Sequence, residues 1–319
     1  MITPDPAVIA LALLLDLMLG DPRWLPHPVA LIGHLITCLE KILRSAIHHE
    51  QVAGVMLLII TVGSTMATIW LLLRCAAYLH PLAGFLAAVI LAFTCLAARS
   101  LHDESALVAN ALIAGDIDAA RHKLSYIVGR DTGHLDEAEI WRALVETVAE
   151  NTADGIIAPL FWLFLGGPVA GMAFKAVSTL DSMVGYKNRR YLRLGWASAR
   201  MDDLMNFIPS RLTALLLIIS APLAGLSLSG ALRITLRDRL KHPSPNSGHP
   251  EAAAAGALGV RLGGMAHYGG QPSLKEYIGE PISILDEKAY QGMVRLMYTA
   301  TLIMAVAGIA TAMYLHPSA

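Results

Sequence analysis

Charged residues are scarce in this sequence. Only 15% of its 319 residues are Asp, Glu, Lys or Arg, whereas 55% are hydrophobic, and soluble globular chains average about 25% charged residues. The formal net charge is −1, so no overall positive field favours nucleic acid as a partner. We therefore expect a polytopic membrane protein that binds no nucleic acid.

Cysteine is also scarce. Cys38, Cys75 and Cys95 are scattered in or beside apolar stretches, and neither a CxxC motif nor a Cys/His cluster occurs. This pattern excludes a disulfide framework and a structural zinc site. No basic region precedes the first apolar run, so we expect no cleaved signal peptide.

The common nucleotide-binding motifs are missing. The sequence contains no GxxxxGK[ST] loop and no GxGxxG after a strand. A nucleotide that binds this chain is therefore bound by a different motif. The paired NDxxD-type motifs of intramembrane prenyltransferases are missing too, because Asp202-Asp203 followed by Asn206 matches them poorly.

Long apolar segments are what the sequence has instead. Several are long enough to cross a bilayer as helices, and others are short or broken by Gly and Pro, which suits kinked or re-entrant helices. We predict an all-α, polytopic integral membrane helical bundle with about four full spans plus broken or re-entrant helices, in one domain over residues 1–319. The full apolar segments are 52–73, 82–98 and 296–315, and the short or broken ones are 7–20, 156–177 and 212–228.

Lysine and arginine predict the topology. They gather in the polar segments about 99–155, 178–206 and 229–295, which the positive-inside rule places in the cytoplasm. For 178–206 two placements stay open. Full spans on both sides would put it outside, whereas re-entrant segments put it in the cytoplasm, and we favour the second because both flanking segments carry Gly or Pro breaks.

A row of acidic residues leads into one of the broken apolar segments. In 141–162, WRALVETVAENTADGIIAPLFW, Glu146, Glu150 and Asp154 recur every four residues, so a helix would place them on one stripe. Two interpretations remain open. The stripe is either a solvated face with Arg142 paired to Glu146, or an acidic site at a membrane surface that holds a divalent cation.

Other polar residues add basic groups to this acidic row. Arg211 lies at the edge of an apolar segment, where a charged residue usually faces a cavity or a partner, and Arg99 either does the same or reaches the membrane boundary. Lys187, Arg189 and Arg190 suit either phosphate or lipid headgroups. Carboxylates for Mg²⁺ and cations for phosphate are together the inventory of a phosphate-handling enzyme.

Five blocks carry a resemblance to a known family. They are GDPRWLPHPVALIG, ETVAENTADGIIAPLFW, STLDSMVGYKNRRY, ARMDDLMNFIPSRLTALL and HPSPNSGHPEAAAAGALGVRLGG. In this order they resemble the adenosylcobinamide-phosphate synthase family of cobalamin biosynthesis, and they cover most of the chain.

The resemblance implies an ATP-dependent amide-forming ligase in the bacterial cytoplasmic (inner) membrane. Such an enzyme joins (R)-1-amino-2-propanol O-phosphate, or free aminopropanol, to a propionate carboxyl of adenosylcobyric acid. The product is adenosylcobinamide phosphate, and ATP and Mg²⁺ are required. The implied partners are the corrinoid, aminopropanol phosphate, the lipid bilayer and other cobalamin-assembly enzymes.

On this basis we assign roles as hypotheses. We expect Mg²⁺ at the acidic row, basic groups on the phosphates, and a base that takes the proton of the attacking ammonium. The predicted metal ligands are Glu146, Glu150 and Asp154. The predicted catalytic residues are Glu150, Asp154, Lys187, Asp202 and His249. The predicted binding residues are Asp21, His27, Arg99, Asn151, Asp181, Arg189, Arg190, Arg211 and Asn246.

Two rival functions belong to other classes. One is an intramembrane transferase of the prenyl type, which the missing acidic motifs disfavour. The other is a membrane sensor or transporter, for which Asp16 and Arg211 inside or beside apolar segments would be suitable. The sequence shows no internal repeat of the kind common in transporters.

Overall fold

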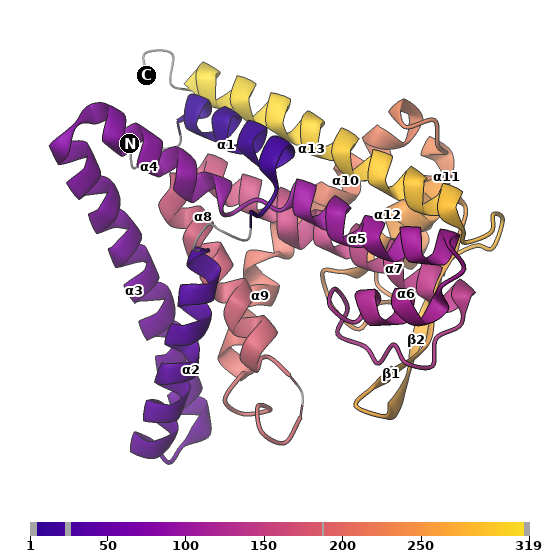
Figure 1. Cartoon of the computed structure of the whole chain (residues 1–319), viewed down its shortest axis with the longest axis horizontal. Coiled ribbons are helices and arrows are strands. Elements are labelled where there is room, and N and C mark those ends of the chain that lie inside the picture. Colours follow the sequence, from indigo (N-terminus) through magenta and orange to yellow (C-terminus); the bar gives the residue numbers. More distant parts are fainter. Residues whose placement is uncertain (1–4, 23–26, 187, 316–319) are drawn as a thin grey trace. The chain divides into compact units, whose positions relative to one another are not determined.

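The computed structural model describes residues 5–22, 27–186 and 188–315. Almost all of its regular structure is helical, with one two-stranded sheet (Figure 1). The chain forms two compact units. Unit 1 comprises residues 1–97, 158–206 and 305–319, and unit 2 comprises 98–157 and 207–304. That the whole chain is one domain stays a prediction.

Three helices of unit 1, α1 (Pro6–Leu19), α2 (Pro28–Ala46) and α4 (Pro81–Phe93), begin at prolines. The unit also contains α3 (Glu50–Leu79), α8 (Ala158–Val184), α9 (Trp196–Met205) and the end of α13 (Glu287–Leu315). Proline has no N–H to lose at the first helical position. The residue before it then caps the helix, as Asp5, His27 and His80 do for α1, α2 and α4.

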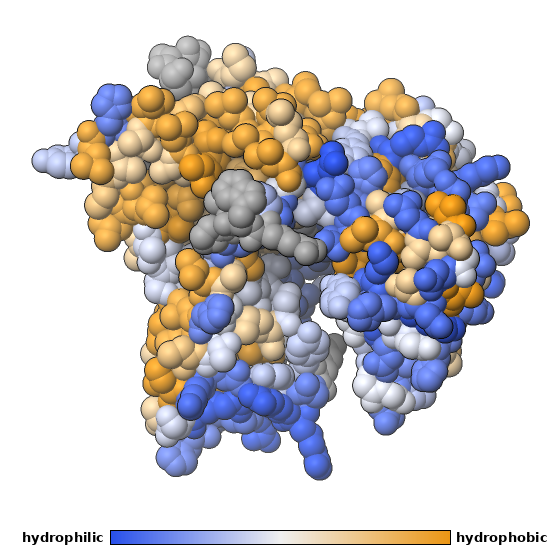
Figure 2. Space-filling view, in the orientation of Figure 1, coloured by the Kyte–Doolittle hydropathy of each residue, from blue (hydrophilic) through white to orange (hydrophobic). Residues whose placement is uncertain are grey.

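The core of unit 1 lies where α2, α3, α8 and α9 meet. Ile36, Leu57 and Leu180 are fully buried in it. Gly54 lets α3 approach the chain at Leu194 closely, because a Cβ on Gly54 would lie 1.9 Å from the Leu194 carbonyl oxygen. Figure 2 shows apolar side chains over α1 and α4, and hydrophilic ones where the end of α2 meets the start of α3.

The predicted fold class is confirmed. Four helical stretches among the described residues are long and apolar enough to cross a membrane, and α9 with α10 (Phe207–Leu223), bent by 42°, could make a fifth. The four are Glu50–Leu79, Pro81–Ile113, Glu137–Val184 and Glu287–Tyr314. Large apolar side chains such as Ile59 and Leu71 are more than half exposed on α3, as lipid-facing residues are in the absence of lipid.

The acidic stretch is continuous with a broken apolar helix. The chain runs from α7 (Glu137–Asn151) through one π-helical turn, η1 (Thr152–Ile157), into α8. The break expected at Gly166-Gly167 is present, because both glycines leave helical geometry and Gly167 has a φ of 63°. Glycine populates positive φ at little cost, so these residues allow the kink.

Unit 2 surrounds a short buried helix. Its elements are α5 (Ala98–Ile113), α6 (Ile117–Leu124), α7, η1, α10, α11 (Leu228–Asp238), α12 (Gly248–Leu258), β1 (Arg261–Tyr268), β2 (Gln271–Gly279) and most of α13. Every residue of α12 is buried. Its small side chains permit close packing, since a Cβ on Gly256 would lie 2.3 Å from the Gly230 carbonyl oxygen of α11.

The β-hairpin was not predicted from the sequence. β1 and β2 pair antiparallel, with an irregularity between Leu262 and Gly264. Gly269 and Gly270 connect them at φ values of 58° and 75°, and a two-residue Gly-Gly loop with positive φ suits the twist of paired strands.

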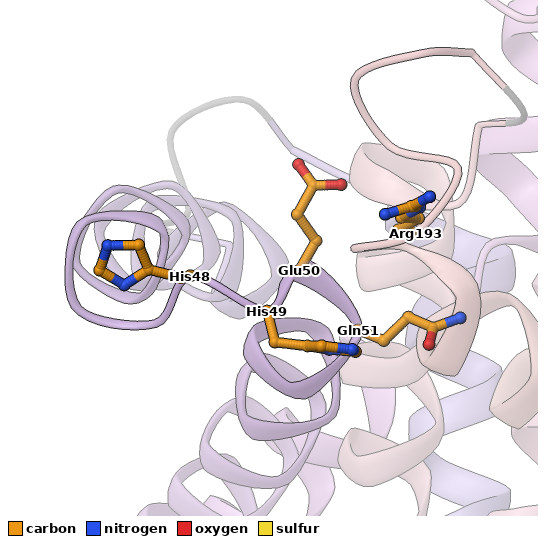
Figure 3. A pocket seen from close by; sticks show the side chains of 5 residues that line it. All are labelled: His48, His49, Glu50, Gln51 and Arg193. Atoms are coloured by element: carbon orange, nitrogen blue, oxygen red, sulfur yellow. The ribbon is translucent and has the colours of Figure 1, made fainter.

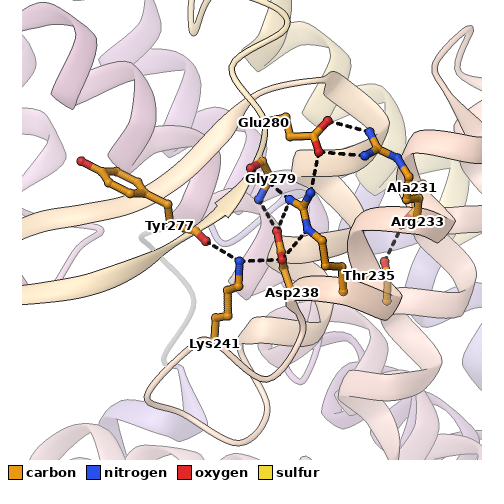
Figure 4. A network of polar contacts seen from close by, with 9 residues as sticks. Ala231, Arg233, Thr235, Asp238, Lys241, Tyr277, Gly279 and Glu280 are labelled. Atoms are coloured by element: carbon orange, nitrogen blue, oxygen red, sulfur yellow. Dashed lines mark hydrogen bonds and ion pairs between the residues drawn. The ribbon is translucent and has the colours of Figure 1, made fainter.

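Ionic contacts join the far end of the hairpin to α11 (Figure 4). Asp238 is fully buried and accepts hydrogen bonds from Gly279 N at 2.9 Å and Arg237 Nη2 at 2.7 Å. Lys241 Nζ lies 2.7 Å from the other carboxylate oxygen. Glu280 accepts from Arg237 and from Arg233, whose Nη2 is 2.6 Å away. The network therefore anchors β2 to α11, and β2 can position its side chains over the interior of unit 2.

Candidate active site

Glu146 of α7 is a buried structural acceptor. Its side chain is 4% exposed, and Arg130 Nη2 donates to Oε2 at 2.5 Å. The backbone N–H of Gly263, in β1, donates to Oε1 at 2.7 Å, and Arg142 Nε lies 3.9 Å from the same oxygen. Glu146 thereby joins the loop before α7 to the hairpin.

Glu150, one helical turn later, faces a small polar cavity. The cavity has a volume of about 200 Å³ and is lined by Ile127, Val128, Gly129, Arg130, Thr147, Glu150, Asn151, Tyr268 and Lys275. Ser247 Oγ donates to Glu150 Oε1 at 2.8 Å. Asn151 Nδ2 donates to the Thr147 carbonyl oxygen at 2.9 Å. A carboxylate and an ammonium group therefore line one small polar cavity.

A third carboxylate lies beside this cavity. Glu251 of α12 is 3% exposed, and its Oε1 is 3.6 Å from His242 Nε2. Burial first, and then the charges of Glu146 and Glu150, raise the pKa of the Glu251 carboxyl well above its usual range. The interior of unit 2 thus favours the protonated form of Glu251.

His242 is surrounded by hydrogen-bond donors. Burial and the Lys275 ammonium lower its pKa, which favours the neutral imidazole. Ser244 N–H donates to Nδ1 at 3.0 Å, so the ring proton lies on Nε2. Nε2 faces Glu251 Oε1 and also Lys275 Nζ, at 3.2 Å. Both the Nε2–H group of His242 and the Lys275 ammonium are donors, so their contact lacks an acceptor. A bound anion would supply one.

The raised pKa of Glu251 predicts a pH-dependent stability that Glu251→Gln removes. Below the ordinary glutamate pKa of 4.5, both folded and unfolded chains hold the proton. As the pH rises above it, the unfolded state releases the proton first, so stability falls by about 1.4 kcal/mol per pH unit until the folded-state pKa is reached. Glutamine mimics the neutral acid and abolishes this slope.

Melting temperatures of the purified protein between pH 5 and pH 8 measure this effect. We expect the parent chain to lose more stability over this range than Glu251→Gln, and Glu137→Gln, at an exposed site on α7, to behave like the parent. Equal pH slopes for the parent and Glu251→Gln would contradict the assignment.

A second polar cluster contains other predicted residues. Arg211 Nη1 donates to Asn246 Oδ1 at 3.2 Å, and His249 is 5% exposed near the start of α12. Asn246 precedes Ser247, which binds Glu150, so adjacent residues connect the two clusters. Six predicted residues therefore lie together in unit 2: Glu146, Glu150, Asn151, Arg211, Asn246 and His249.

Several predicted residues belong instead to unit 1. His27 Nδ1 accepts from Val29 N at 3.3 Å as the cap of α2, and Asp202 accepts from Asn206 at 3.1 Å. Arg190 donates to Glu40 at 3.2 Å. Asp21, Asp181 and Arg189 also lie in this unit. Lys187 lies outside the described residues. The role of this group in the reaction stays a prediction.

Arg99 and Asp154 are two further predicted residues of unit 2. Arg99 forms a two-pronged contact with Asp103, with both oxygens 2.9 Å from Nε. Asp154 is half-buried within η1.

The predicted three-carboxylate metal site is not formed. No group of three His, Cys, Asp or Glu side chains in the described part of the chain is arranged to hold a metal ion. Both carboxylate oxygens of Glu146 already accept hydrogen bonds, one from Arg130 and the other from the Gly263 N–H. Asp154 lies in the π-helical turn η1 that follows α7, and not in a continuous α-helix with Glu146 and Glu150. That Glu150 binds a metal ion stays a prediction.

Three side chains of this site were assigned no role in the sequence analysis. Lys275, His242 and Glu251 come from β2, from the loop before α12 and from α12. The segment 242–251, HPSPNSGHPE, is rich in polar residues. This composition was the signal in the sequence for His242 and Glu251. Lys275 had no comparable signal because the hairpin was not predicted.

Comparisons with known proteins agree with one another. The family model for the CobD/Cbib protein matches residues 9–297. A cobalamin biosynthesis protein CobD of Pelobacter propionicus is 69% identical over 316 residues, which are 99% of this chain and 98% of that protein. The cobalamin biosynthesis protein CbiB of Salmonella typhimurium is 47% identical over 294 residues, 91% of this chain and 92% of its own.

No solved structure matches the chain. The family model nevertheless covers most of the sequence, and the two relatives match it nearly from end to end. The chain therefore belongs to the CobD/CbiB protein family.

Proposed function

We propose that this chain is an enzyme of cobalamin biosynthesis in the bacterial cytoplasmic membrane that forms an amide at the expense of ATP. It would join adenosylcobyric acid to (R)-1-amino-2-propanol O-phosphate and release adenosylcobinamide phosphate. Relatives named for cobalamin biosynthesis and the apolar helices support the pathway and the membrane location. The resemblance described above supports the reaction.

One observation within the structure carries the chemistry. Glu150 and Lys275 line the same small cavity, and donors outnumber acceptors around the neighbouring His242 Nε2. A phosphate group would supply acceptors to Lys275 and His242. The site is therefore suited to phosphoryl transfer and charge stabilisation.

Amide formation from a carboxylate needs activation, because a carboxylate is a poor electrophile. A propionate oxygen of the corrinoid attacks the γ-phosphorus of ATP, ADP leaves, and an acyl phosphate forms. The amine nitrogen then attacks the acyl carbon, the C–O bond to phosphate breaks, and inorganic phosphate and the amide result. One proton leaves the attacking nitrogen, and a nearby base must accept it.

Residues of unit 2 can serve these steps. Lys275, which lines the cavity, can neutralise phosphate charge in the transition state. Arg130 is less available for this role because Glu146 already pairs with it. Magnesium would supply further charge neutralisation, and Glu150 fits as its protein ligand because one oxygen binds Ser247 and the side chain lines the cavity.

A reconstituted assay tests the proposed function. The purified chain in liposomes is mixed with adenosylcobyric acid, aminopropanol phosphate and Mg-ATP, and mass spectrometry follows adenosylcobinamide phosphate while ADP is quantified. We expect both products in equal amounts and neither when ATP or the amine is omitted. A folded protein that binds the corrinoid yet forms no amide would eliminate this function in favour of a sensor or transporter.

A further inference from the structure

Three cationic or donor groups gather at the start of α12, near the polar cavity lined by Glu150 and Lys275. Arg211 comes from α10, Arg239 follows α11 and His249 lies in the first turn of α12. Arg211 is linked to this turn through Asn246. Arg239 is linked through its backbone, because a Cβ on Gly248 would lie only 2.4 Å from the Arg239 carbonyl oxygen.

Both arginines are held by neutral groups. Arg211 Nη1 donates to the Phe207 carbonyl oxygen at 2.6 Å, and its guanidinium lies 3.6 Å from the centre of the Phe207 ring. Arg239 Nη1 donates to the Leu236 carbonyl oxygen at 2.6 Å. Among the described residues, neither has a carboxylate within 4.0 Å, unlike Arg130, Arg142, Arg233 and Arg237. Within the described part of the chain, both guanidinium groups are therefore fixed in place without an ion pair.

His249 adds a buried nitrogen that lacks an acceptor. Its Nε2 is inaccessible to solvent and has no hydrogen-bond partner in the described part of the chain. Burial, and then Arg211 and Arg239, lower the pKa of His249 to about 4. The neutral imidazole can carry its proton on Nε2 and donate it. Buried polar groups are usually satisfied, so this nitrogen points to a ligand acceptor.

The helix terminus contributes to the same site. Ser247 is the N-cap of α12, but its side chain makes no capping hydrogen bond and binds Glu150 instead. The positive end of the helix dipole therefore lacks the usual side-chain cap, and such ends favour anions.

We propose that Arg211, Arg239 and His249 form a binding subsite for a phosphate dianion at the start of α12, separate from the cavity lined by Glu150. Asn246 and Ser247 place it next to that cavity, because one residue binds Arg211 and the next binds Glu150. Given the proposed function, the phosphate would belong either to the phosphorylated amine or to the nucleotide.

Binding of inorganic phosphate tests the subsite without turnover. Melting temperatures of the purified chain are measured against potassium phosphate, with potassium chloride matched in ionic strength. We expect phosphate to stabilise the parent chain, and Arg239→Gln and Arg211→Gln to weaken the apparent affinity about tenfold or more, since each loses a charge-assisted contact. Arg211→Lys, which keeps the charge but loses the guanidinium fork, replaces Arg211→Gln if that variant does not purify.

Arg193→Gln is the matched control. Arg193 lies in unit 1 and lines, with His48, His49, Glu50 and Gln51, a different polar notch of about 410 Å³ (Figure 3). We expect this variant to bind phosphate like the parent. Undiminished phosphate stabilisation in Arg239→Gln, or its loss in Arg193→Gln alone, would overturn the assignment.

Steady-state kinetics then identify the source of the phosphate. If the amine supplies it, Arg239→Gln raises KM for aminopropanol phosphate about tenfold and leaves KM for free aminopropanol unchanged. If the nucleotide supplies it, KM for ATP rises instead. Should the chain form no amide at all, the phosphate titration still decides the subsite, so the two proposals fail separately.

Discussion

The Glu150→Gln variant is expected to lose roughly 100-fold or more of the amide-forming activity while it inserts and purifies like the parent chain. Glutamine keeps the shape of the side chain and an oxygen that accepts from Ser247 Oγ. It removes the negative charge that faces the cavity containing Lys275, and with it the proposed ligand of magnesium. Initial rates in liposomes at saturating Mg-ATP measure the loss.

Glu137→Gln is the control for this variant. Glu137 begins the same helix but is exposed and outside the cavity, so its rate should match that of the parent chain. Activity of Glu150→Gln within twofold of the parent would remove both the metal-binding and the catalytic role from Glu150.

Glu146→Ala should produce the largest loss of stability, about 3–5 kcal/mol. The Arg130 side chain is 10% exposed and would keep a buried charge without its partner. The Gly263 N–H would lose its acceptor as well, which separates the hairpin from α7. Thermal unfolding of the purified protein, together with the yield of membrane-inserted chain, measures the effect.

A paired substitution distinguishes this structural role from a metal-binding role. Replacing both partners with apolar residues, Arg130→Met with Glu146→Leu, should recover much of the stability because no buried charge remains unpaired. Asp118→Asn is the control, since the Asp118–Arg121 pair is exposed and should contribute less than about 1 kcal/mol. A Glu146→Ala variant as stable as the parent, but with altered magnesium dependence, would return Glu146 to the metal site.

The apolar spans and the break in α8 could be predicted from local sequence. Apolar runs such as 52–73 lie within α3, and the glycines at 166 and 167 interrupt α8 as expected. Caps are similarly local, because His27 and the proline after it determine where α2 begins. These features depend on residues within one or two turns of each other.

The candidate site was predictable only in part. The spacing of Glu146 and Glu150 correctly indicated an acidic row on α7. It could not show that Arg130 and the Gly263 N–H would bind both oxygens of Glu146, nor that Asp154 would lie in a π-helical turn. Lys275 escaped notice because a loop and a hairpin are hard to distinguish when the strands lack regular alternation of apolar and polar residues.

By itself, then, the amino-acid sequence determined that the chain is a helical membrane protein, where its helices break, and which segments carry chemistry. Hydrophobicity and backbone preference act over a few residues, so they can be read without coordinates. Only the tertiary structure decided that Glu150 meets Ser247, that His242 lies between Glu251 and Lys275, and that Arg211 and Arg239 converge on α12. Such pairings depend on the rotation and depth of each packed helix, and long-range packing sets both.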